Sequence, residues 1–549
     1  MKNLLLIFLL LAGGMLTAQQ PYPVQLADAY MKRNPDSIRV SETKAARWGY
    51  DQGILLKALE RVWVTTGDAR YFNYIKKEAD LYVKADGRIT GYVYDHFNVD
   101  NIPSGRLLLM LYQVSLPQKE KYKKAADLLW TQVNNQFSSQ DGGYPGGGTL
   151  PFSAEYSRIF DRPEYLDRIF EQIDQIEKIH KTRGHFKDPA VGGYAMALVD
   201  VLDYVPADHP KREHLISYLQ RLAPEIVHYQ ERRSGLWDAP ESDISCMWVY
   251  TLAKAAGRGY IPAKYLENAR KGYNGIRKAI RSKESTLSVA YTGTLILAGL
   301  EMEAADERQV LKPGTVALDY YFNREFRKDL NGNTEQFHYT WEDRMHSGFW
   351  IWGQVFQDLG ARTIAIKEAP SAENLKDAQA YIIVDPDTPK ETAEPNYIGA
   401  EHIKTIREWV ENGGTLVLLA NDTSNCEIPR FNELAGAFGI RFTHKNINYI
   451  PGGKDFELAA VNIEPGNEIF KNTRKVYAKE IVTLEVSEPA RALVKKGEDI
   501  VMAVSAVGKG RVFVIGDPWL YNEYVDGRII GPEYQNMQAL RDLSHWILK

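Results

Sequence analysis

One pattern recurs six times between Trp48 and Gly299: a loop with Gly or Ser leads into a strongly apolar helix, and an amphipathic, charged helix follows. The period is roughly 45 to 55 residues, which is typical of repeat architectures whose units bury their apolar faces against each other. The pattern predicts six helical hairpins closed into a ring, an (α/α)6 barrel over residues 21–310, with its sixth outer helix at 24–34. The apolar helices are expected to begin near Trp48, Ser104, Gly148, Val191, Asp243 and Tyr291.

Length, charge and the N-terminus limit the class of protein. A chain of 549 residues is long enough for two or more domains. Its net charge of −4 gives no support for nucleic-acid binding or membrane attachment, so we expect neither nucleic acid nor membrane insertion. Residues 1–20 have the order of a secretory signal, with Lys2, the apolar run 4–11 and the small-residue segment 16–18. We therefore expect export to the periplasm; a homo-oligomer is left open.

A different pattern begins after the barrel, over residues 311–549. Short β-rich runs such as AYIIVDPD and GTLVLLAND alternate with amphipathic helices such as GAEHIKTIREWVENGG. Apolar, unalternated strands separated by helices are typical of a parallel sheet covered on both faces, so we predict a doubly wound α/β domain. The two cysteines, Cys246 and Cys426, fall in different predicted domains and form no disulfide framework.

Several blocks of the first domain resemble the unsaturated rhamnogalacturonyl hydrolases of glycoside hydrolase family 105 and the related family 88 glucuronyl hydrolases. The resemblance implies an enzyme acting on the uronic-acid ends of oligosaccharides that polysaccharide lyases produce. In these families an Asp pair hydrates the C4–C5 double bond of an unsaturated uronate. The matching blocks are RWGYDQGILLKAL at 47–59, FNVDNIPSGRLLLMLY at 97–112, LPFSAEYSRIF at 150–160, YAMALVDVLDYVPADHP at 194–210 and SCMWVYTLAKAAGRGY at 245–260.

The chain departs from these families at the expected site. Asp100 matches the first catalytic Asp of the resemblance, but Tyr144 stands where the second is expected, and Asp141 is the nearest carboxylate. The Arg and Trp that the families carry before YAMAL are replaced by Pro189 and Gly193. The resemblance therefore transfers the scaffold fully and the hydration machinery in part.

The second domain resembles the flavodoxin-like, glutamine-amidotransferase-like domains often appended to such hydrolases. Cys426 lies in a polar loop without elbow glycines, so we predict that the domain lacks a catalytic Cys. We further expect it to pack against the barrel and lend residues to the barrel mouth. The residues expected there are Trp341, Glu342, Asp343 and His346, and the alternative is that they only pack at the domain junction.

The loops before the inner helices supply the candidate site. Glycoside cleavage needs two carboxyls, and we select Asp100, Asp141 and Asp238 as catalytic candidates. Asp100 is alternatively a cap for the helix near Ser104, Asp141 a turn residue, and Asp243 a cap for the next inner helix. We expect no metal and no cofactor, because no His/Cys/Asp cluster has metal-ligand spacing. The expected substrate-binding residues are Trp48, Tyr50, His96, Arg106, Tyr144, His185, Trp237 and Glu241.

Two of these expectations rest on side-chain chemistry. Arg106 would fork onto a uronate carboxylate, with a surface salt bridge as the alternative. Trp237 would stack against a sugar, beside Asp238. The favoured function is a glycoside hydrolase that removes a terminal uronic acid, unsaturated or saturated. The alternatives are a β-glucuronidase acting on saturated ends, a non-catalytic carbohydrate-binding protein, and a structural partner that works through the second domain.

Overall fold

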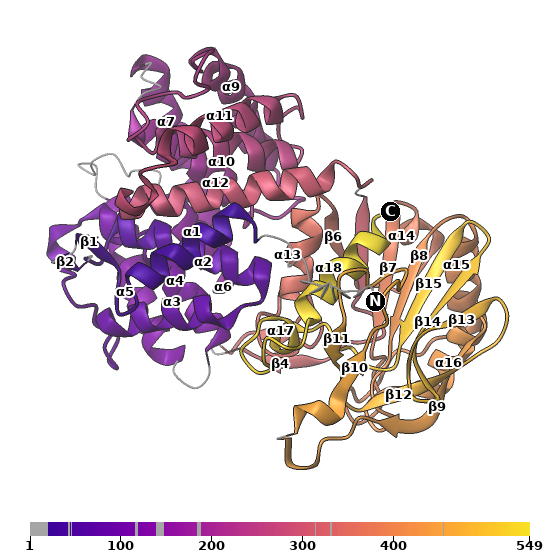
Figure 1. The fold of residues 1–549 in the computed structure, drawn as a ribbon. Helices are drawn as coiled ribbons and strands as arrows, with labels where there is room; N and C mark the ends of the chain where they lie inside the picture. Colours follow the sequence, from indigo (N-terminus) through magenta and orange to yellow (C-terminus); the bar gives the residue numbers. More distant parts are fainter. Residues whose placement is uncertain are drawn as a thin grey trace, which may run out of the picture.

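The protein folds into a helical domain followed by an α/β domain, as the computed structural model shows (Figure 1). The structure describes residues 20–41, 44–45, 47–115, 119–138, 148–183, 188–312, 314–329, 332–453 and 455–549. All of the predicted signal except Gln20 lies outside these residues. Within them, no helix has both the length and the apolar character needed to cross a membrane.

The helical domain is the predicted ring of hairpins. Each inner helix contacts the next, and the last, α12, returns to the first, α2. The inner helices are α2 (Tyr50–Thr66), α4 (Gly105–Val114), α6 (Thr149–Ile159), α8 (Pro189–Val201), α10 (Ile244–Gly257) and α12 (Val289–Arg308). The outer helices are α1 (Tyr22–Arg33), α3 (Ala69–Tyr82), α5 (Lys119–Ser138), α7 (Glu164–Arg183), α9 (Arg212–His228) and α11 (Tyr265–Ile280).

Glycines allow the inner helices to approach each other closely. A Cβ atom on Gly53 of α2 would lie 2.7 Å from the backbone nitrogen of Ser104, just before α4. A Cβ on Gly293 of α12 would lie 2.8 Å from the Cα of Leu55. Because backbone cannot move aside as a side-chain end can, the sequence needs glycine at these two crossings.

Polar side chains fill the interior of the ring toward the carboxyl ends of the inner helices. Arg106 donates to Asp200 (2.7 Å) and to Glu155 (3.2 Å). Lys254 donates to Asp200 and to Asp203, both at 2.7 Å. These charges are buried but paired, as buried charges must be, and they surround a cavity of only about 110 Å3.

The second domain is built on a nine-stranded sheet. Its parallel part runs β6 (Arg362–Ile366), β3 (Thr315–Asp319), β7 (Ala378–Val384), β8 (Thr415–Leu419) and β15 (Gly510–Ile515), an order of 2-1-3-4-5 known from doubly wound sheets. The sequence did not predict the antiparallel extension through β14 (Asp499–Val507), β13 (Ala490–Lys496), β12 (Ile481–Val486) and β9 (Ile440–Ile447).

Small elements complete the architecture. Three short antiparallel pairs lie outside the large sheet. They are β1 (Arg39–Ser41) with β2 (Lys44–Ala45), β4 (Phe326–Lys328) with β5 (Thr334–Gln336), and β10 (Ala460–Asn462) with β11 (Lys475–Tyr477). The helices of this domain are α13 (Trp350–Asp358), α14 (Ala372–Leu375), α15 (Ala400–Glu411), α16 (Ile428–Gly436), α17 (Asn522–Val525) and α18 (Asn536–Ile547).

The sheet buries both faces, which explains its apolar central strands. In β8, Leu416 and Leu418 pack into one apolar cluster with α15 and α16. The alternate residues Val417 and Leu419 join a second cluster with α13 and α18, and that cluster is continuous with the barrel core. The 2-residue period of a strand thus assigns successive side chains to different layers.

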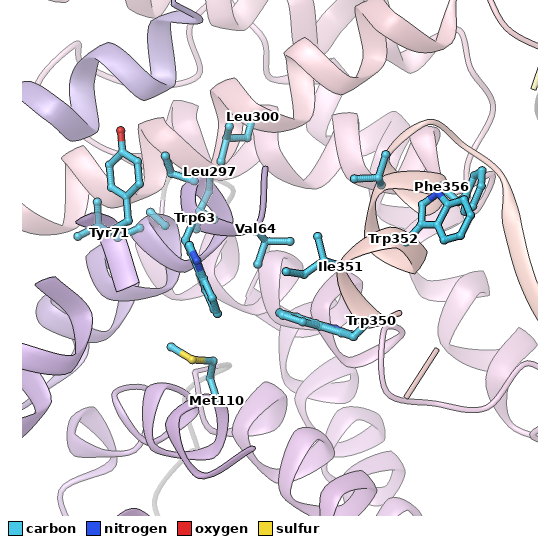
Figure 2. Close-up of a cluster of buried hydrophobic side chains, with 14 of the residues drawn as sticks. Trp63, Val64, Tyr71, Met110, Leu297, Leu300, Trp350, Ile351, Trp352 and Phe356 are labelled. Carbon is cyan, nitrogen blue, oxygen red and sulfur yellow. The ribbon is translucent and has the colours of Figure 1, made fainter. Parts of the chain in front are cut away.

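The domain junction lies at the carboxyl ends of the inner helices. Figure 2 shows Trp63 and Val64 of α2 beside Trp350 and Ile351 of α13, with the two indole rings 6.4 Å apart. Arg528 of the second domain donates to the carbonyl of Val114, the last residue of α4 (2.7 Å). The α/β domain therefore covers the end of the barrel at which the inner helices finish.

This placement corrects the expectation that the second domain reaches the barrel mouth. Glu342 lies 4.0 Å from Arg158, near the carboxyl end of α6, and Arg344 lies 3.7 Å from Glu155 in the ring interior. Trp341 and Asp343 are buried at the junction. His346 pairs with Glu523 of its own domain at 3.1 Å. These residues lie at the end opposite the mouth, because the mouth is formed where the inner helices begin.

Candidate active site

Loops that precede the inner helices converge around Tyr50, the first residue of α2. A Cβ on Gly193 of α8 would lie 4.0 Å from the Tyr50 hydroxyl, and one on Gly148, before α6, would lie 3.8 Å from its ring. Gly49 lies against the backbone oxygen of Asp100, with its Cβ position 3.6 Å away. The predicted meeting of these loops at one mouth is confirmed.

Trp48 fixes the second loop against the first. Its side chain is buried, and its indole nitrogen donates to the backbone oxygen of Asn101 (2.9 Å). Ser104 donates to the backbone oxygen of Gly49 (2.7 Å) in the same region. Asp100 lies between these two contacts, in a short 3-10 helix over Val99–Asn101, so its backbone is held firmly while its side chain is exposed.

Three carboxyls and the Tyr50 hydroxyl act on one another electrostatically. Burial, and then the charges of Asp243, Asp51 and Asp100, raise the pKa of Tyr50. Partial burial and the Asp100 charge raise the pKa of Asp51. Burial raises the pKa of Asp243, and Asp51 adds to this effect. Neighbouring acids that oppose each other's ionisation favour one protonated and one ionised member, which is the arrangement that acid–base catalysis on a sugar requires.

The capping roles that the sequence allowed for Asp100 and Asp243 are wrong. Ser104 occupies the position before α4, and no side chain caps that helix. Asp243 occupies the position before α10, but its side chain makes no capping hydrogen bond. Both carboxylates are thus available to the mouth.

Three predicted substrate-binding residues are structural. Trp48 is one of them, because its ring is buried and its indole nitrogen is bonded to the backbone of the second loop. Arg106 is 8% exposed and bound to Asp200 and Glu155, so it is neither a uronate ligand at the mouth nor a surface salt bridge. Trp237 is 3% exposed, and its indole nitrogen donates to the backbone oxygen of Ile226 (2.6 Å). A Cβ on Gly272 would lie 2.5 Å from the Trp237 ring, which places the ring in the core against α11 rather than on a sugar.

The remaining predicted residues have varied positions. Tyr50 is central, His96 is exposed at the end of a short 3-10 helix, Asp238 is half-buried, and Glu241 is exposed and paired with Lys283 (2.9 Å). The roles of His96, Asp238 and Glu241 stay predictions. Asp141, Tyr144 and His185 lie outside the described residues, so their roles stay predictions as well.

Asp51 and Asp243 were expected on the loops at the mouth but were not among the predicted catalytic residues. A usable signal existed, since each carboxylate lies at the start of an inner helix and therefore at the mouth of a ring. Among the residues with described positions, no group of three His, Cys, Asp or Glu side chains could hold a metal ion. In the second domain, Cys426 is 3% exposed, and burial followed by the Asp385 charge raises the pKa of its thiol far above the usual range, which does not suit a nucleophile.

Two family models match different parts of the chain. Residues 22–146 and 189–328 match the model of Glycosyl Hydrolase Family 88. Residues 344–526 match DUF4350, a domain of unknown function. The stretch between the two family 88 segments contains α6 and α7.

Solved structures similar to this chain match about half of its length. A family 105 glycoside hydrolase of C. acetobutylicum ATCC 824 is 22% identical, and the match covers 52% of this chain and 99% of that one with a TM-score of 0.44. A family 88 glycosyl hydrolase from Bacteroides vulgatus is 17% identical, with 51% and 97% covered and a TM-score of 0.42. A possible family 105 member from Salmonella enterica serovar Paratyphi A is 16% identical, with 51% and 92% covered and a TM-score of 0.40. The first domain of the chain thus matches Glycosyl Hydrolase Family 88, and the second matches a domain of unknown function.

Proposed function

We propose that this protein is a glycoside hydrolase that removes a terminal uronic acid from polysaccharide-derived oligosaccharides. The observation that carries the proposal is the group of Asp51, Asp100 and Asp243 around Tyr50 at the barrel mouth, whose charges all raise the pKa of the Tyr50 hydroxyl. The match to Glycosyl Hydrolase Family 88 supports the reaction class. The order of the first residues, with Lys2 before the apolar run 4–11, supports export to the periplasm.

The carboxyls divide the work according to their surroundings. Asp243 is the more enclosed of the two, and burial raises its pKa, which suits the role of the acid. Asp100 is exposed and acts as the base toward water. On an unsaturated uronate, the proton goes to C4 and the water oxygen to C5, which consumes the double bond and gives a hemiketal. The hemiketal opens by breaking the ring C5–O5 bond, which gives a ketone at C5 and a hemiacetal at C1. Collapse of this hemiacetal to an aldehyde breaks the C1–O bond and releases the leaving sugar as an alcohol.

The same group suits a saturated uronate by conventional two-carboxyl hydrolysis, in which the acid protonates the glycosidic oxygen while water attacks C1. The absence of an acid at Tyr144, where the resembling families carry their second Asp, favours this variant as the second candidate. Asp243, from a different inner helix, would then supply the missing carboxyl.

Two matched disaccharides test the proposal, one ending in a Δ4,5-unsaturated uronate and the other in saturated glucuronate. Loss of the ultraviolet absorbance of the double bond, with release of reducing sugar, identifies hydration; release from the saturated substrate alone identifies conventional hydrolysis. Asp243→Asn and Asp100→Asn should each lower kcat/KM by roughly 10²- to 10⁴-fold. The control is Asp167→Asn, which removes an exposed carboxylate on outer helix α7 paired with Lys211 and should leave kcat/KM unchanged.

Two results would contradict the proposal. If Asp243→Asn and Asp100→Asn turn over substrate as fast as the native protein, the acid group has no catalytic role. If neither disaccharide is cleaved although both bind, the chain is a carbohydrate-binding protein on a hydrolase scaffold.

A further inference from the structure

A cleft of about 450 Å3 lies between the two domains, at the end of the barrel opposite the mouth. The barrel contributes Tyr112 and Gln113 from the end of α4, Lys119 from the start of α5, and Arg158 from the end of α6. The second domain contributes the β4–β5 hairpin and the segment 342–345. Junctions between domains are frequent places for ligand sites, and this one is independent of the carboxyl group at the mouth.

Cations outnumber acids on the walls of this cleft. Lys119 is half-buried and takes part in no ion pair among the described residues. Burial lowers the pKa of Lys119 and the neighbouring Arg327 lowers it further, while the charges of Glu335 and Glu120 act weakly in the opposite direction. Two cations therefore face each other across the domain boundary. The basic residues are Lys119, Arg158, Arg327, Lys328, Arg344 and Lys367, and the acidic ones are Asp329, Glu335, Glu342 and Asp343.

Most of the acids are already used by the protein. Glu335 and Asp343 accept from Arg327, at 2.6 Å and 3.3 Å. Glu342 accepts from the Tyr320 hydroxyl at 2.6 Å. Lys119 thus has no ion-pair partner among the described residues. An anion entering the cleft would meet its partly desolvated ammonium group, where a charge-assisted hydrogen bond is stronger than on an open surface.

Polar atoms in the same walls also lack partners. The second carboxylate oxygen of Asp343, a residue that is 5% exposed, is buried without a hydrogen bond, and so is the side-chain oxygen of Gln113. A buried acceptor without a partner costs about 1–3 kcal/mol, so a ligand that donates hydrogen bonds here would be favoured. Hydroxyl groups of a sugar are donors of the right kind for these two oxygens.

We propose that this cleft is a second carbohydrate site, which binds an acidic oligosaccharide bearing carboxylate or sulfate groups. The carboxylate or sulfate of the ligand would pair with Lys119, and Arg158 and Lys367 would lie at the open side. Hydroxyl groups of the sugar would donate to Asp343 and Gln113. Because both domains form the walls, a bound ligand bridges them. The site would hold an acidic chain at the covered end of the barrel, separately from any reaction at the mouth.

Calorimetric titration of the full-length protein tests the site with three probes. Saturated tetragalacturonate carries carboxylates, a carrageenan tetrasaccharide carries only sulfates, and cellotetraose carries no charge. We expect at least one acidic probe to bind and cellotetraose to bind at least tenfold more weakly. The acidic probe that binds more tightly identifies the acid group. Equal binding of cellotetraose, or binding of none of the three, would overturn the proposal.

Two variants on one helix localise the binding. Lys119→Gln should weaken binding of the acidic probe by roughly three- to tenfold, since it removes one charge-assisted contact. Lys123→Gln, one turn further along α5, removes a lysine that pairs with Asp127 outside the cleft, and should change nothing. Equal affinities of the native protein and Lys119→Gln would overturn the proposal. A bound probe should also protect Lys119 from acetylation by an N-hydroxysuccinimide ester in the native protein, and full reactivity of Lys119 at saturation would count against it.

A mouth variant separates this inference from the proposed hydrolase function. Asp243→Asn should keep the binding that depends on Lys119, even if it abolishes turnover. If Asp243→Asn abolishes all binding of the acidic probe, the ligand occupies only the mouth and the cleft is not a site. Turnover at the mouth without any binding that depends on Lys119 would likewise refute the second site in the cleft, while the proposed hydrolase function would stand.

Discussion

Asp358 brings a negative charge from the second domain to three arginines of the barrel, and Asp358→Asn should destabilise the protein strongly. Arg61 donates to both carboxylate oxygens (2.9 Å and 3.0 Å), and Arg258 lies 3.5 Å away. Arg308 donates to the Asp358 backbone oxygen (2.6 Å) and keeps that bond in the variant. Removing one partner of a buried ion pair costs about 3–5 kcal/mol, and the retained amide oxygen places our expectation near about 3 kcal/mol.

The effect should depend on pH with a definite sign. Burial raises the pKa of Asp358, but the charges of Arg61, Arg258 and Arg308 outweigh it and bring the pKa below its ordinary value. A carboxyl whose pKa is lower in the folded than in the unfolded state stabilises the fold above the unfolded pKa, which is about 3.9. The difference in unfolding free energy between the native protein and Asp358→Asn should therefore have its full value at pH 7. It should shrink as pH falls below about 4.

Urea unfolding, followed by both tryptophan fluorescence and circular dichroism, measures this difference. Two probes are needed because two domains need not unfold in one step. The matched control is Asp306→Asn, which removes an exposed carboxylate at the end of α12 that pairs with Arg270, and it should cost about 1 kcal/mol or less. Equal shifts of the urea midpoint in Asp358→Asn and Asp306→Asn would refute the argument that burial at the junction sets the cost.

Three further predictions concern packing and buried charge. Gly53→Ala should lower the urea midpoint, because the new Cβ would lie 2.7 Å from the backbone nitrogen of Ser104. Gly193→Ala should leave the midpoint unchanged or raise it, because the nearest atom to its Cβ lies 4.0 Å away. The reverse order of the two midpoints would contradict the close helix crossing at Gly53. Ile351→Ala at the junction in Figure 2 should cost about 2–5 kcal/mol in urea unfolding, and a loss under 1 kcal/mol would mean that the site is not close-packed. Burial raises the pKa of Asp319 to about 7, so the folded state binds a proton there that the unfolded state has lost. The free energy of unfolding should therefore fall as pH rises from about 4 to about 7, by on the order of 4 kcal/mol (about 3 pH units at about 1.4 each). Asp319→Asn should flatten this pH dependence of the unfolding free energy, and an unchanged pH dependence would contradict the assignment.

The sequence predicted the barrel closely because its signal is local and repeated. The inner helices were expected to begin near Ser104, Gly148 and Asp243, and they begin at Gly105, Thr149 and Ile244. The central strands of the second domain were equally visible, since burial on both faces leaves an uninterrupted apolar run. Strand β13 was missed because it alternates buried and more exposed residues and carries charged side chains, which resembles a surface loop.

The site was harder to predict because its contacts join residues far apart in the chain. Arg106 stands at a helix start, where local pattern favours an exposed side chain, but its partners Glu155 and Asp200 lie 49 and 94 positions further on. Asp243 has the local character of a cap, and only its closeness to Asp51 in the folded ring changes its role. The prediction that Trp237 stacks against a sugar was wrong for the same reason, because burial of its ring against α11 depends on the fold that brings the two segments together.

The polar network inside the ring and the α/β domain behind it make the barrel a blind tube. Arg106, Asp200 and Lys254 fill the lumen, and Trp350 with its neighbours lies behind them. A polymer cannot thread through such a tube; it can only insert an end and withdraw it. An enzyme built this way would shorten its substrate one residue at a time from a terminus, and internal cleavage of a long chain would be closed to it by geometry before any chemistry begins.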